Sequence, residues 1–415
     1  MPAPSRLRLA EGQTPSRAGG VGSVRRPSAE RWLARTFLRA MGNPPVGLAL
    51  WNGDHVCPTD TEPVATVRVK DRQTLLRLMY NPELEFGEAY TDGRLQVDGD
   101  LVGLLEALGR APTAPRAGRL LRRPQRSHTN TLRGSRDNIH RHYDISNAFY
   151  RLWLDERMVY TCAYFPTPNA SLEEAQVAKM EHVCRKVGLR PGERVIEAGC
   201  GWGALALYMA RQYGVSVRAF NISHEQIVYA REQARAQGLS DRVEFIEDDY
   251  RNVSGQYDAF VSVGMLEHVG LDHYPALGRV IDRCLPPQGR GFLHSIGRNA
   301  PEHLNAWIEK RIFPGAYPPS LREMLTVIEP FGFSVLDIEN LRLHYAATLR
   351  QWLVRFERSV ERVAAMFDDR FVRAWRLYLA GSIAAFSTGS LQLFQVSFAR
   401  RCDNAIPWTR AHLYQ

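Results

Sequence analysis

The sequence predicts an α/β fold with a parallel sheet, preceded by a small α+β domain. Three observations support this prediction. From about residue 138, short apolar strands alternate with amphipathic helices. A glycine-rich turn joins one strand to the next helix, as at the ligand-binding edge of open α/β sheets. Before residue 107, short apolar runs are separated by turn residues and followed by helical periodicity.

The N-terminal part of the chain divides into segments of different composition. Residues 1–30 are rich in Arg, Ser, Gly and Pro and lack the apolar core of a secretory signal, which indicates a disordered basic tail. Residues 31–106 form the predicted small domain, with strand alternation first and helical periodicity afterwards. Residues 107–137 are an Arg-rich linker to the larger domain at 138–415.

The positive charge is concentrated in the linker. The chain has a formal net charge of +9, and residues 107–136 carry eight arginines and no acidic residue. This composition favours a polyanionic partner, either phospholipid headgroups or nucleic acid, and a solvated linker is the alternative. Because nothing else in the chain resembles a nucleic-acid-binding module, we expect no nucleic acid partner.

The cysteines and the longest uncharged run bear on the location of the protein. The six cysteines are widely scattered, which indicates reduced thiols in the cytoplasm, and no paired CxxC motif predicts a metal site. The run Leu377 to Ala399 is long enough to span a bilayer. Its seven Ser, Thr and Gln residues favour a buried segment of a soluble domain instead.

The larger domain begins its predicted sheet at the glycine-rich turn. Strands are expected at 194–199, 216–222, 242–249, 257–264 and 291–297, and helices at 203–213 and 224–237. In "VIEAGCGWGALALYMA", Gly199, Gly201 and Gly203 allow a tight turn and the close approach of a ligand.

The acid before these glycines indicates the kind of ligand. Glu197 stands two residues before the first glycine, which differs from the dinucleotide fingerprint, and the motif has no P-loop lysine. A carboxylate suits an amine-bearing ligand better than a pyrophosphate, which favours S-adenosylmethionine over NAD. An ordinary turn beside a chance acid is the alternative.

Two further pairs of residues are placed to contact the nucleoside of such a ligand. Asn221 and Gln226, in "NISHEQ", follow the second strand and can hydrogen-bond the ribose hydroxyls. Asp249 and Tyr250 follow the third strand and are placed to meet the adenine by a hydrogen bond and by stacking.

Several stretches between about residues 140 and 400 resemble the motifs of a known enzyme family and occur in the same order. They include "HYDISNAFYRLWLDERMVYTCAYF", "VIEAGCGWGALAL", "MLEHVG", "FLHSIG", "RIFPGAYPPS", "HYAATLRQW" and "GSLQLFQVSF". The chain resembles the cyclopropane-fatty-acyl-phospholipid synthases and the related mycolic acid cyclopropane synthases, which are class I S-adenosylmethionine-dependent methyltransferases. Residues 82–101 also resemble the small N-terminal domain of the phospholipid-acting branch.

The resemblance implies a Rossmann-like, seven-stranded, mostly parallel sheet and a specific reaction. The methyl group of S-adenosylmethionine is transferred to the double bond of an unsaturated acyl chain in a membrane phospholipid, a bound bicarbonate removes a proton, and a cyclopropane ring closes. The family's bicarbonate-binding residues carry over as Cys162, Glu267, His294, Ile296 and Tyr345. Tyr160 and Thr161 carry over as contacts of the methionine moiety, with Thr161 in place of the commoner serine.

The resemblance also suggests the surroundings of the reaction. Aromatic rings can stabilise the cationic intermediate, and the candidates are Tyr143, Tyr150, Tyr160, Tyr164, Phe165 and Tyr317. We expect a homodimer that associates peripherally with the cytoplasmic face of the membrane and favours anionic lipid.

Two alternatives to this function remain open. An enzyme on the same scaffold can methylate or methylenate the acyl chain to a branched lipid, of the 10-methyl or methylene type, without closing the ring. An inactive lipid-binding module is the second alternative, and the intact glycine loop and anion-site residues argue against it. A nucleophilic role for Cys162 is disfavoured, because methylation of an alkene requires no covalent enzyme intermediate.

Overall fold

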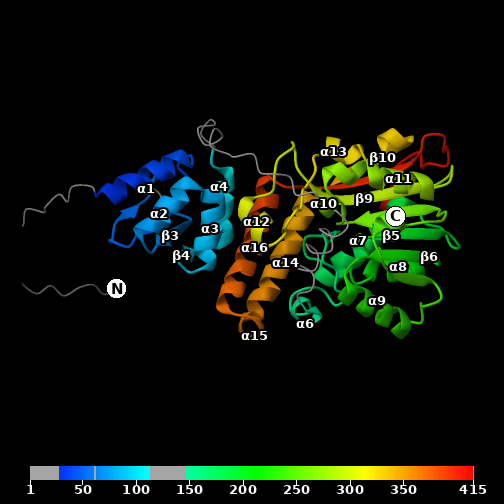
Figure 1. Cartoon of the computed structure of the whole chain (residues 1–415), viewed down its shortest axis with the longest axis horizontal. Coiled ribbons are helices and arrows are strands. Elements are labelled where there is room, and N and C mark those ends of the chain that lie inside the picture. Colours follow the sequence, from blue (N-terminus) through cyan, green and yellow to red (C-terminus); the bar gives the residue numbers. More distant parts are fainter. Residues whose placement is uncertain (1–27, 60–61, 113–145, 415) are drawn as a thin grey trace, which may run out of the picture.

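The computed structural model describes residues 28–59, 62–112 and 146–414, and it contains two sheets with long helices between them (Figure 1). The smaller sheet belongs to the N-terminal domain and the larger one to the C-terminal domain. Helices α14 (Arg342–Arg358) and α16 (Asp369–Thr388) lie between the two sheets (Figure 1). Most of the predicted tail and of the predicted linker lies outside the described residues.

The larger sheet confirms the predicted α/β class. Its seven strands run in the order β10-β11-β9-β8-β5-β6-β7, and β11 is antiparallel to both of its neighbours while the pairs from β9 to β7 are parallel. Five strands match the predicted ones: β5 (Arg194–Ala198), β6 (Ser216–Asn221), β7 (Val243–Glu247), β8 (Ala259–Val263) and β9 (Arg290–Gly297).

The sheet contains two further strands that the pattern of the sequence did not predict. They are β10 (Phe333–Asn340) and β11 (Gln392–Arg400). The uncharged run 377–399 divides at Gly389, whose φ of 85° ends α16, and its second half enters the sheet as β11. The run is buried as expected. Within the described ranges, every helix falls short of the length and apolar character that a membrane span requires.

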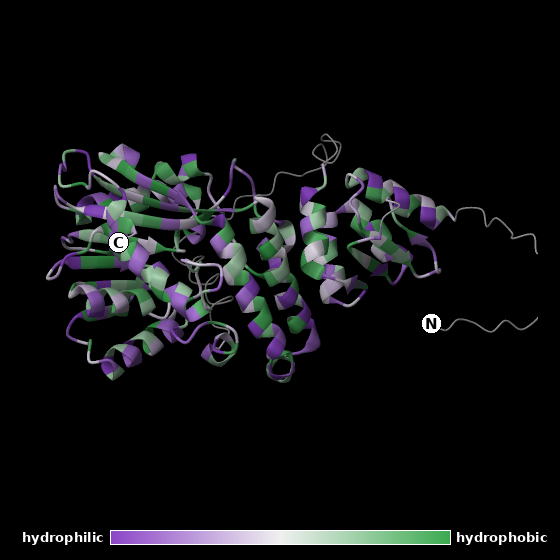
Figure 2. Cartoon of the chain, turned by 180° about the vertical axis from the view of Figure 1, so that it is seen from behind, coloured by the Kyte–Doolittle hydropathy of each residue, from purple (hydrophilic) through white to green (hydrophobic). Residues whose placement is uncertain are grey.

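Helices cover both faces of this sheet, so the inner strands such as β5, β8 and β11 are buried on two sides, whereas the edge strand β10 is partly exposed. One face packs against α7 (Leu172–Val187), α8 (Ala204–Tyr213) and α9 (His224–Ala236). The other face packs against α11 (Tyr274–Cys284) and the short helices α10 (Leu266–Val269) and α13 (Leu321–Leu325). Most helices carry both hydrophobic and hydrophilic residues (Figure 2), as a helix between sheet and solvent requires.

The N-terminal domain has a four-stranded sheet in the order β2-β1-β3-β4. Its elements in chain order are α1 (Ala29–Ala40), β1 (Gly47–Leu50), β2 (His55–Val56), β3 (Ala65–Val69), α2 (Arg72–Tyr80), α3 (Pro82–Thr91), β4 (Leu95–Gly99) and α4 (Leu101–Arg110). Ser28 caps α1 by accepting a hydrogen bond from the Arg31 N–H, so the helix begins just inside the predicted tail. Helix α4 likewise extends into the predicted linker as far as Arg110.

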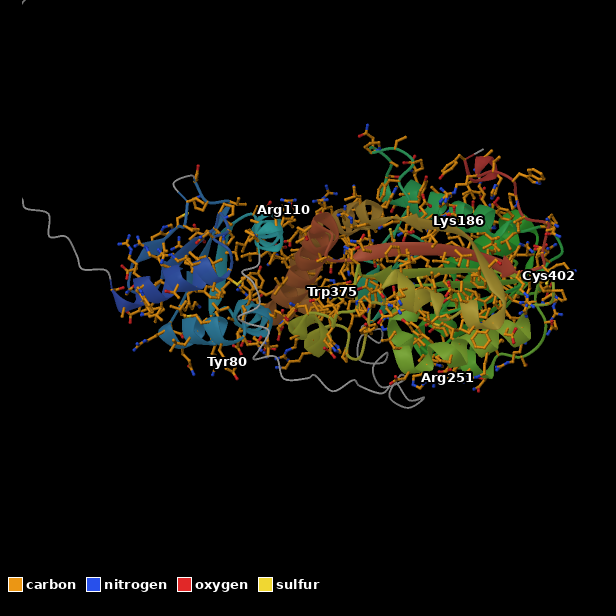
Figure 3. The ribbon with its side chains drawn as sticks, turned by 90° about the horizontal axis from the view of Figure 1, so that it is seen from above. Tyr80, Arg110, Lys186, Arg251, Trp375 and Cys402 are labelled. Carbon is orange, nitrogen blue, oxygen red and sulfur yellow. The ribbon has the colours of Figure 1, made fainter. Side chains whose placement is uncertain are left out.

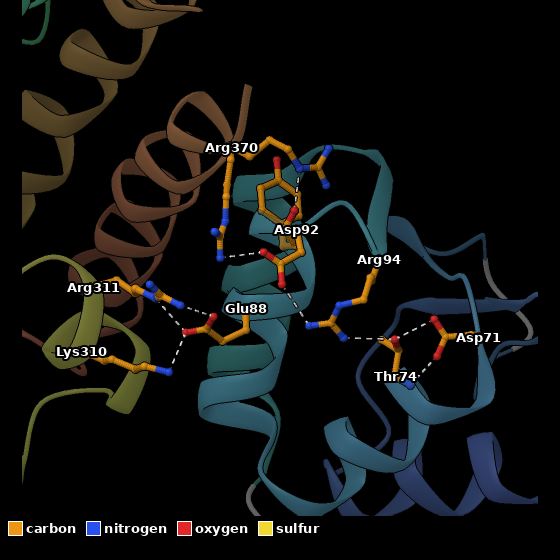
Figure 4. A network of polar contacts seen from close by, with 10 residues as sticks. Asp71, Thr74, Glu88, Asp92, Arg94, Lys310, Arg311 and Arg370 are labelled. Carbon is orange, nitrogen blue, oxygen red and sulfur yellow. Dashed lines mark hydrogen bonds and ion pairs between the residues drawn. The ribbon is translucent and has the colours of Figure 1, made fainter. Parts of the chain in front are cut away.

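The N-terminal domain shares a hydrophobic core with α14 and α16. The remaining helices of this region are α6 (Asn147–Tyr150), α12 (Ala306–Arg311) and α15 (Val360–Met366). Glu88 on α3 accepts two hydrogen bonds from Arg311 on α12, at 2.8 and 2.6 Å, and lies 3.2 Å from the Lys310 Nζ (Figure 4). Asp92 binds Arg370 of α16 at 2.9 Å in the same network (Figure 4). Paired charges therefore connect the two domains around an apolar contact.

Candidate active site

The glycine-rich turn takes the backbone from β5 into α8 by a path that larger residues adopt poorly. Gly199 has a φ of 84°, and a Cβ atom there would lie 2.8 Å from the Met265 Cβ. Gly201 has a φ of 54°, and a Cβ atom there would meet nothing within 4 Å. The backbone at Gly201 therefore borders open space, which is what close approach of a ligand requires.

A cavity lies above this turn, at the carboxyl ends of β5, β6 and β8. It has an empty volume of about 1110 Å³ including its open mouth, which is large enough for a nucleoside-sized ligand. Nine of the ten predicted cofactor-binding residues line it: Tyr160, Thr161, Glu197, Gly199, Gly201, Asn221, Gln226, Asp249 and Tyr250. Gly203 is not among the lining residues, because it packs against Phe245 and Ala230 at the start of α8, where a Cβ atom would lie 2.5 Å from Phe245.

Glu197 brings a buried carboxylate to this cavity. Its side chain is buried on β5, and Oε2 has no hydrogen-bond partner among the described residues. Burial raises its pKa to about 7, although Lys179 nearby opposes the shift. A carboxyl oxygen that lacks a partner at the wall of a cavity is suited to bind a donor on a ligand, such as an α-ammonium group.

Lys179 lines the same cavity and was not found by the sequence patterns. It lies on α7 with 2% of its surface exposed, and its Nζ donates to the Thr161 Oγ1 at 3.1 Å. Burial lowers its pKa to about 8, and Asp155, Cys162 and Glu197 oppose that shift. A lysine among apolar helix residues resembles any solvent-facing lysine in sequence, and only the packing of α7 beneath residues 159–161 reveals its place.

The predicted nucleoside contacts surround the other end of the cavity. Asn221 Nδ2 donates to the Gln226 Oε1 at 2.7 Å and to the Gly201 carbonyl at 3.2 Å. Gln226 lines the cavity, and because its Oε1 is the acceptor in this contact, its amide nitrogen is the donor that it can offer elsewhere. Asp249 is buried and accepts from the Arg251 N–H at 2.9 Å. The Arg251 guanidinium lies over the Tyr250 ring at 5.3 Å from its centroid.

Three of the five predicted anion-site residues meet at the carboxyl ends of β8 and β9. The Ile296 N–H donates to the Glu267 Oε1 at 2.5 Å, and the Glu267 Oε2 is buried without a partner among the described residues. Burial raises the pKa of Glu267 to about 7. His294 is buried and burial lowers its pKa to about 3, so the ring is neutral. The Gln395 amide lies 3.1 Å from its Nδ1, which leaves Nε2 for another partner.

The other two predicted residues, Cys162 and Tyr345, reach the same region through Leu341. The Leu341 carbonyl accepts from the Tyr345 N–H at 3.1 Å and lies 4.0 Å from the Cys162 Sγ. The Leu341 N–H donates to the Leu393 carbonyl at 2.9 Å, and Leu393 pairs with Ile296 in the sheet. The fold therefore connects the backbone segments that carry these five residues at one end of β9 and β11, although they are four separate segments of the chain.

Cys162 is a neutral thiol. It is fully buried and its Sγ lies 3.1 Å from the Ala163 carbonyl. Burial raises the pKa of the thiol far above its ordinary value of 9.0. A nucleophilic cysteine needs a stabilised thiolate, which this environment disfavours.

A shell of aromatic rings, some of them from α14 and α16, lies beside the cofactor cavity. Tyr160 and Trp202 line the cavity, and each contacts Tyr150, with ring centroids at 5.4 and 4.9 Å. The Tyr160 hydroxyl lies 2.8 Å from the Tyr378 hydroxyl on α16. Further rings of the shell are Trp153, Trp352 and Trp375, and Trp375 lies on α16 between the N-terminal domain and the larger sheet (Figure 3).

The shell differs from the one that the sequence predicted. Tyr150 and Tyr160 belong to it, whereas Tyr164 stacks between His182 and His344, at 4.4 and 4.9 Å. Tyr317 donates its hydroxyl proton to Glu323 instead, at 3.0 Å, and Tyr143 lies outside the described residues. The tryptophans were not among the predicted wall residues, because they come from separate segments of the chain and only the fold brings their rings together.

Comparison with known proteins identifies the family. The model of the mycolic acid cyclopropane synthetase family matches residues 130–396, and a domain of unknown function (DUF7884) matches residues 33–114. The cyclopropane-fatty-acyl-phospholipid synthase of Escherichia coli K12 is 37% identical over 353 residues, which cover 82% of this chain and 90% of the relative. The chain belongs to the cyclopropane synthase family.

Other relatives agree on the class of enzyme. A "Probable fatty acid methyltransferase" of Pseudomonas putida is 34% identical over 89% of this chain and 96% of its own length. The solved structure of the mycolic acid cyclopropane synthase CmaA1, complexed with SAH and CTAB, superposes with a TM-score of 0.61 at 28% identity, covering 64% of this chain and 98% of that one. This cyclopropane synthase family member is therefore a class I methyltransferase that uses S-adenosylmethionine to methylate unsaturated lipid chains.

Proposed function

We propose that this enzyme converts the double bond of an unsaturated acyl chain in a membrane phospholipid into a cyclopropane ring, with bicarbonate held in the site around Glu267. The observation that carries the proposal is the Glu267 carboxylate, which has one oxygen bound to the Ile296 N–H and the other buried without a partner among the described residues. The E. coli relative, which bears the name of this activity, supports the phospholipid substrate.

The cavity residues fit S-adenosylmethionine. Glu197 offers a carboxyl oxygen without a partner to an α-ammonium group, and the open space at Gly201 admits the ligand against the backbone. Gln226 and Asp249 offer a donor and an acceptor to the nucleoside. The CmaA1 structure, whose title names SAH, supports the same ligand class for this cavity.

The residues around Glu267 fit bicarbonate, whose oxygens accept hydrogen bonds and whose O–H donates one. The neutral His294 can donate through Nε2, the Tyr345 hydroxyl is a further donor, and Cys162 adds a small, weakly polar wall. Glu267 Oε2 supplies the acceptor that the O–H needs, which explains a carboxylate beside an anion. When bound, bicarbonate supplies a base for the proton that must leave the transferred methyl group.

The aromatic shell suits the cationic stage of the reaction. An alkene is a weak nucleophile, so the enzyme must align it with the methyl donor and exclude water. Tyr160 and Trp202 place aromatic faces on the cavity wall, and the faces of aromatic rings attract cations. Trp352 continues this surface as far as Tyr345, with ring centroids 6.0 Å apart.

Lipid analysis tests the proposal. Phospholipids from a host that expresses the protein are expected to gain the mass of one CH₂ group per modified chain and to lose the olefinic proton signals of that chain. Glu267→Gln is the control, because it removes the acceptor and keeps the size of the side chain. Full activity in that variant would contradict the role of Glu267.

Methylation to a branched chain without ring closure is the second candidate. The P. putida relative, whose name is that of a fatty acid methyltransferase, favours it. Both reactions need the same methyl donor and the same removal of a proton, so the residues of the site are compatible with both reactions. A terminal methylene or a branched methyl signal in the product, in place of cyclopropane protons, would establish this second reaction.

We also propose that the enzyme acts as a peripheral membrane protein at the cytoplasmic face, as a homodimer. The supporting feature is the eight-arginine segment 107–136, which is suited to anionic headgroups. Residues 113–136 of that segment lie outside the described residues. Sedimentation equilibrium of the purified full chain tests the dimer, and a monomeric mass across the accessible concentrations would refute it.

A further inference from the structure

Lys179 is a buried cation in the wall of the cofactor cavity. It lies in the middle of α7 with 2% of its surface exposed, and it lines the cavity together with Thr161 and Glu197. The charges of Asp155 and Glu197 act on its ammonium group, but neither carboxylate makes a direct ion pair with its Nζ, whose hydrogen bond goes to Thr161. The buried Lys186 on the same helix is different, because it pairs with Asp337 and Glu339 at 3.4 and 2.7 Å. A buried ammonium without such a pair is costly unless something else compensates its charge.

The contact between Lys179 and Thr161 has a fixed direction. An ammonium group donates hydrogen bonds and cannot accept them, so the Thr161 Oγ1, at 3.1 Å, is the acceptor. The hydroxyl proton of Thr161 must therefore point to a different acceptor. Because Thr161 lines the cavity, an acceptor on a bound ligand is in reach of that proton.

Helix α7 holds residues 159–161 by a second contact that does not depend on Lys179. Gln176, one turn earlier, donates through Nε2 to the Thr161 carbonyl at 2.9 Å and to the Val159 carbonyl at 3.4 Å. The backbone of this segment therefore keeps its place when the Lys179 ammonium is removed. Removal of the ammonium should therefore change only the orientation of the Thr161 hydroxyl and the charge of the cavity.

One end of the cavity thus presents two opposite charges. Lys179 with the Thr161 hydroxyl forms a positive, hydrogen-bond-donating side, and Glu197, with its unpartnered Oε2, forms a negative side. An α-amino acid zwitterion carries the complementary pair, a carboxylate and an ammonium. The methionyl end of S-adenosylmethionine is such a group.

We propose that Lys179 is a positioning residue for the α-carboxylate of the methyl donor, acting through the Thr161 hydroxyl. The inference rests on the proposed binding of S-adenosylmethionine in this cavity. The ammonium directs the Thr161 O–H toward the carboxylate and adds the positive charge that the carboxylate neutralises. Glu197 holds the ammonium group of the same amino acid, so the methionyl end is fixed at two points and the sulfonium methyl is aimed.

Binding of two nucleosides to the purified full chain tests this inference by calorimetry. S-adenosylhomocysteine carries the amino acid group, and 5′-methylthioadenosine lacks it. Lys179→Met is expected to weaken S-adenosylhomocysteine binding about tenfold or more, because a charge-assisted contact is lost, and to change 5′-methylthioadenosine binding less than about threefold. Lys179→Gln, which keeps a donor without the charge, is expected to lie between Lys179→Met and the parent.

Two further variants separate positioning from general damage. Thr161→Val is expected to lose the same selectivity, and the double variant is expected to bind no more weakly than the weaker single one. Lys186→Met removes an equally buried lysine on the same helix and should lower stability without changing the ratio of the two affinities.

The inference fails if Lys179→Met binds S-adenosylhomocysteine as the parent does, or if it weakens both nucleosides equally. If the parent protein itself bound neither nucleoside, the assignment of the cavity to S-adenosylmethionine would fail instead. The parent measurement therefore distinguishes the two failures.

Discussion

The Ile296 N–H donates to the Glu267 Oε1 at 2.5 Å, and this contact joins the end of β9 to the short helix α10. It satisfies one oxygen of a fully buried carboxylate and fixes the direction of the other, which has no partner among the described residues. The arrangement is poor for stability, because burial of an ionised carboxylate costs free energy. Such a cost is expected where the free carboxylate oxygen is needed to accept a hydrogen bond from a ligand.

Replacement of Glu267 by Gln should stabilise the protein at alkaline pH while it reduces activity. Burial raises the pKa of Glu267 from its ordinary value of 4.5 to about 7. The folded state therefore binds more protons than the unfolded state between these values, and stability falls as the pH rises through that window. Above pH 7 the cost is fully present and is on the order of 3 kcal/mol. Urea unfolding of parent and variant at pH 5 and pH 8.5 measures it.

The pH dependence of the difference is the informative quantity. Glu197 has a similarly raised pKa, but it is present in both proteins and cancels from the comparison. The introduced glutamine cannot ionise and keeps an oxygen that accepts from the Ile296 N–H. The unfolding free energy of the variant, relative to that of the parent, should therefore increase between pH 5 and pH 8.5. A difference in unfolding free energy that does not change with pH would show that ionisation of Glu267 is not its cause. We expect activity to fall more than about 100-fold.

Replacement of Cys162 by Ser or Ala should reduce methyl transfer without abolishing it. The buried thiol has a pKa raised by desolvation and lies 3.1 Å from the Ala163 carbonyl, so it acts as a neutral wall. We expect a loss of about three- to 30-fold in either variant, the size of effect of one weak polar contact. Total loss of activity in a folded variant would favour a covalent role.

Alkylation of the native protein gives an independent measure of the Cys162 thiol. Iodoacetamide at pH 8 should modify Cys402, which is exposed, and leave Cys162 unmodified until the protein unfolds. Rapid labelling of Cys162 in the folded enzyme would show that the thiolate is accessible.

The sequence predicted those parts of the site that short motifs determine. The spacing of one strand and its following turn is sufficient to place Glu197, Gly199 and Gly201 at the cavity. Lys179 could not be found in this way, because its position depends on how α7 packs against residues 159–161. Gly203 was assigned to the cavity by spacing, yet its side of the turn faces Phe245.

The fold shows the same division between local and long-range information. Strands β5 to β9 alternate with helices and were predicted. Strand β11 was missed because it is buried on both faces and therefore lacks the alternation of a half-exposed strand. The sequence also suggested a separate N-terminal domain, but its core continues into α16, and contacts between segments about 280 residues apart, such as that of Arg373 with the Tyr90 carbonyl, are not visible in a local pattern.

Binding to anionic lipid should depend on salt. We expect the full chain to sediment with vesicles that contain an anionic phospholipid at low ionic strength, and to dissociate as salt screens the headgroups. Replacing Arg119, Arg122, Arg123 and Arg126 by Gln removes half of the charge of the eight-arginine segment and should weaken low-salt binding. Binding that is equal at low and high salt would exclude this electrostatic attachment.

Replacement of Glu88 by Gln should weaken the contact between the N-terminal domain and α12. Glu88 is 12% exposed and binds Arg311 through both oxygens, with Lys310 beside them (Figure 4). The variant is expected to lose about 1–3 kcal/mol of unfolding free energy at pH 7, as for a charge-assisted pair that is partly buried. Urea unfolding monitored at pH 7 measures this loss.

The Glu88 effect should disappear in acid, and a neighbouring pair supplies the control. The hydrogen bonds from Arg311 lower the pKa of Glu88 below its ordinary value of 4.5. The stabilisation is therefore fully present above pH 4.5 and is lost as the pH falls through the lowered pKa. Asp92→Asn weakens two more exposed pairs, with Arg370 (54% exposed) and Arg94 (28% exposed) around Asp92 (31% exposed), and should cost less than about 1 kcal/mol. If both variants lost the same free energy at pH 7, burial of Glu88 between the two domains would not be the cause.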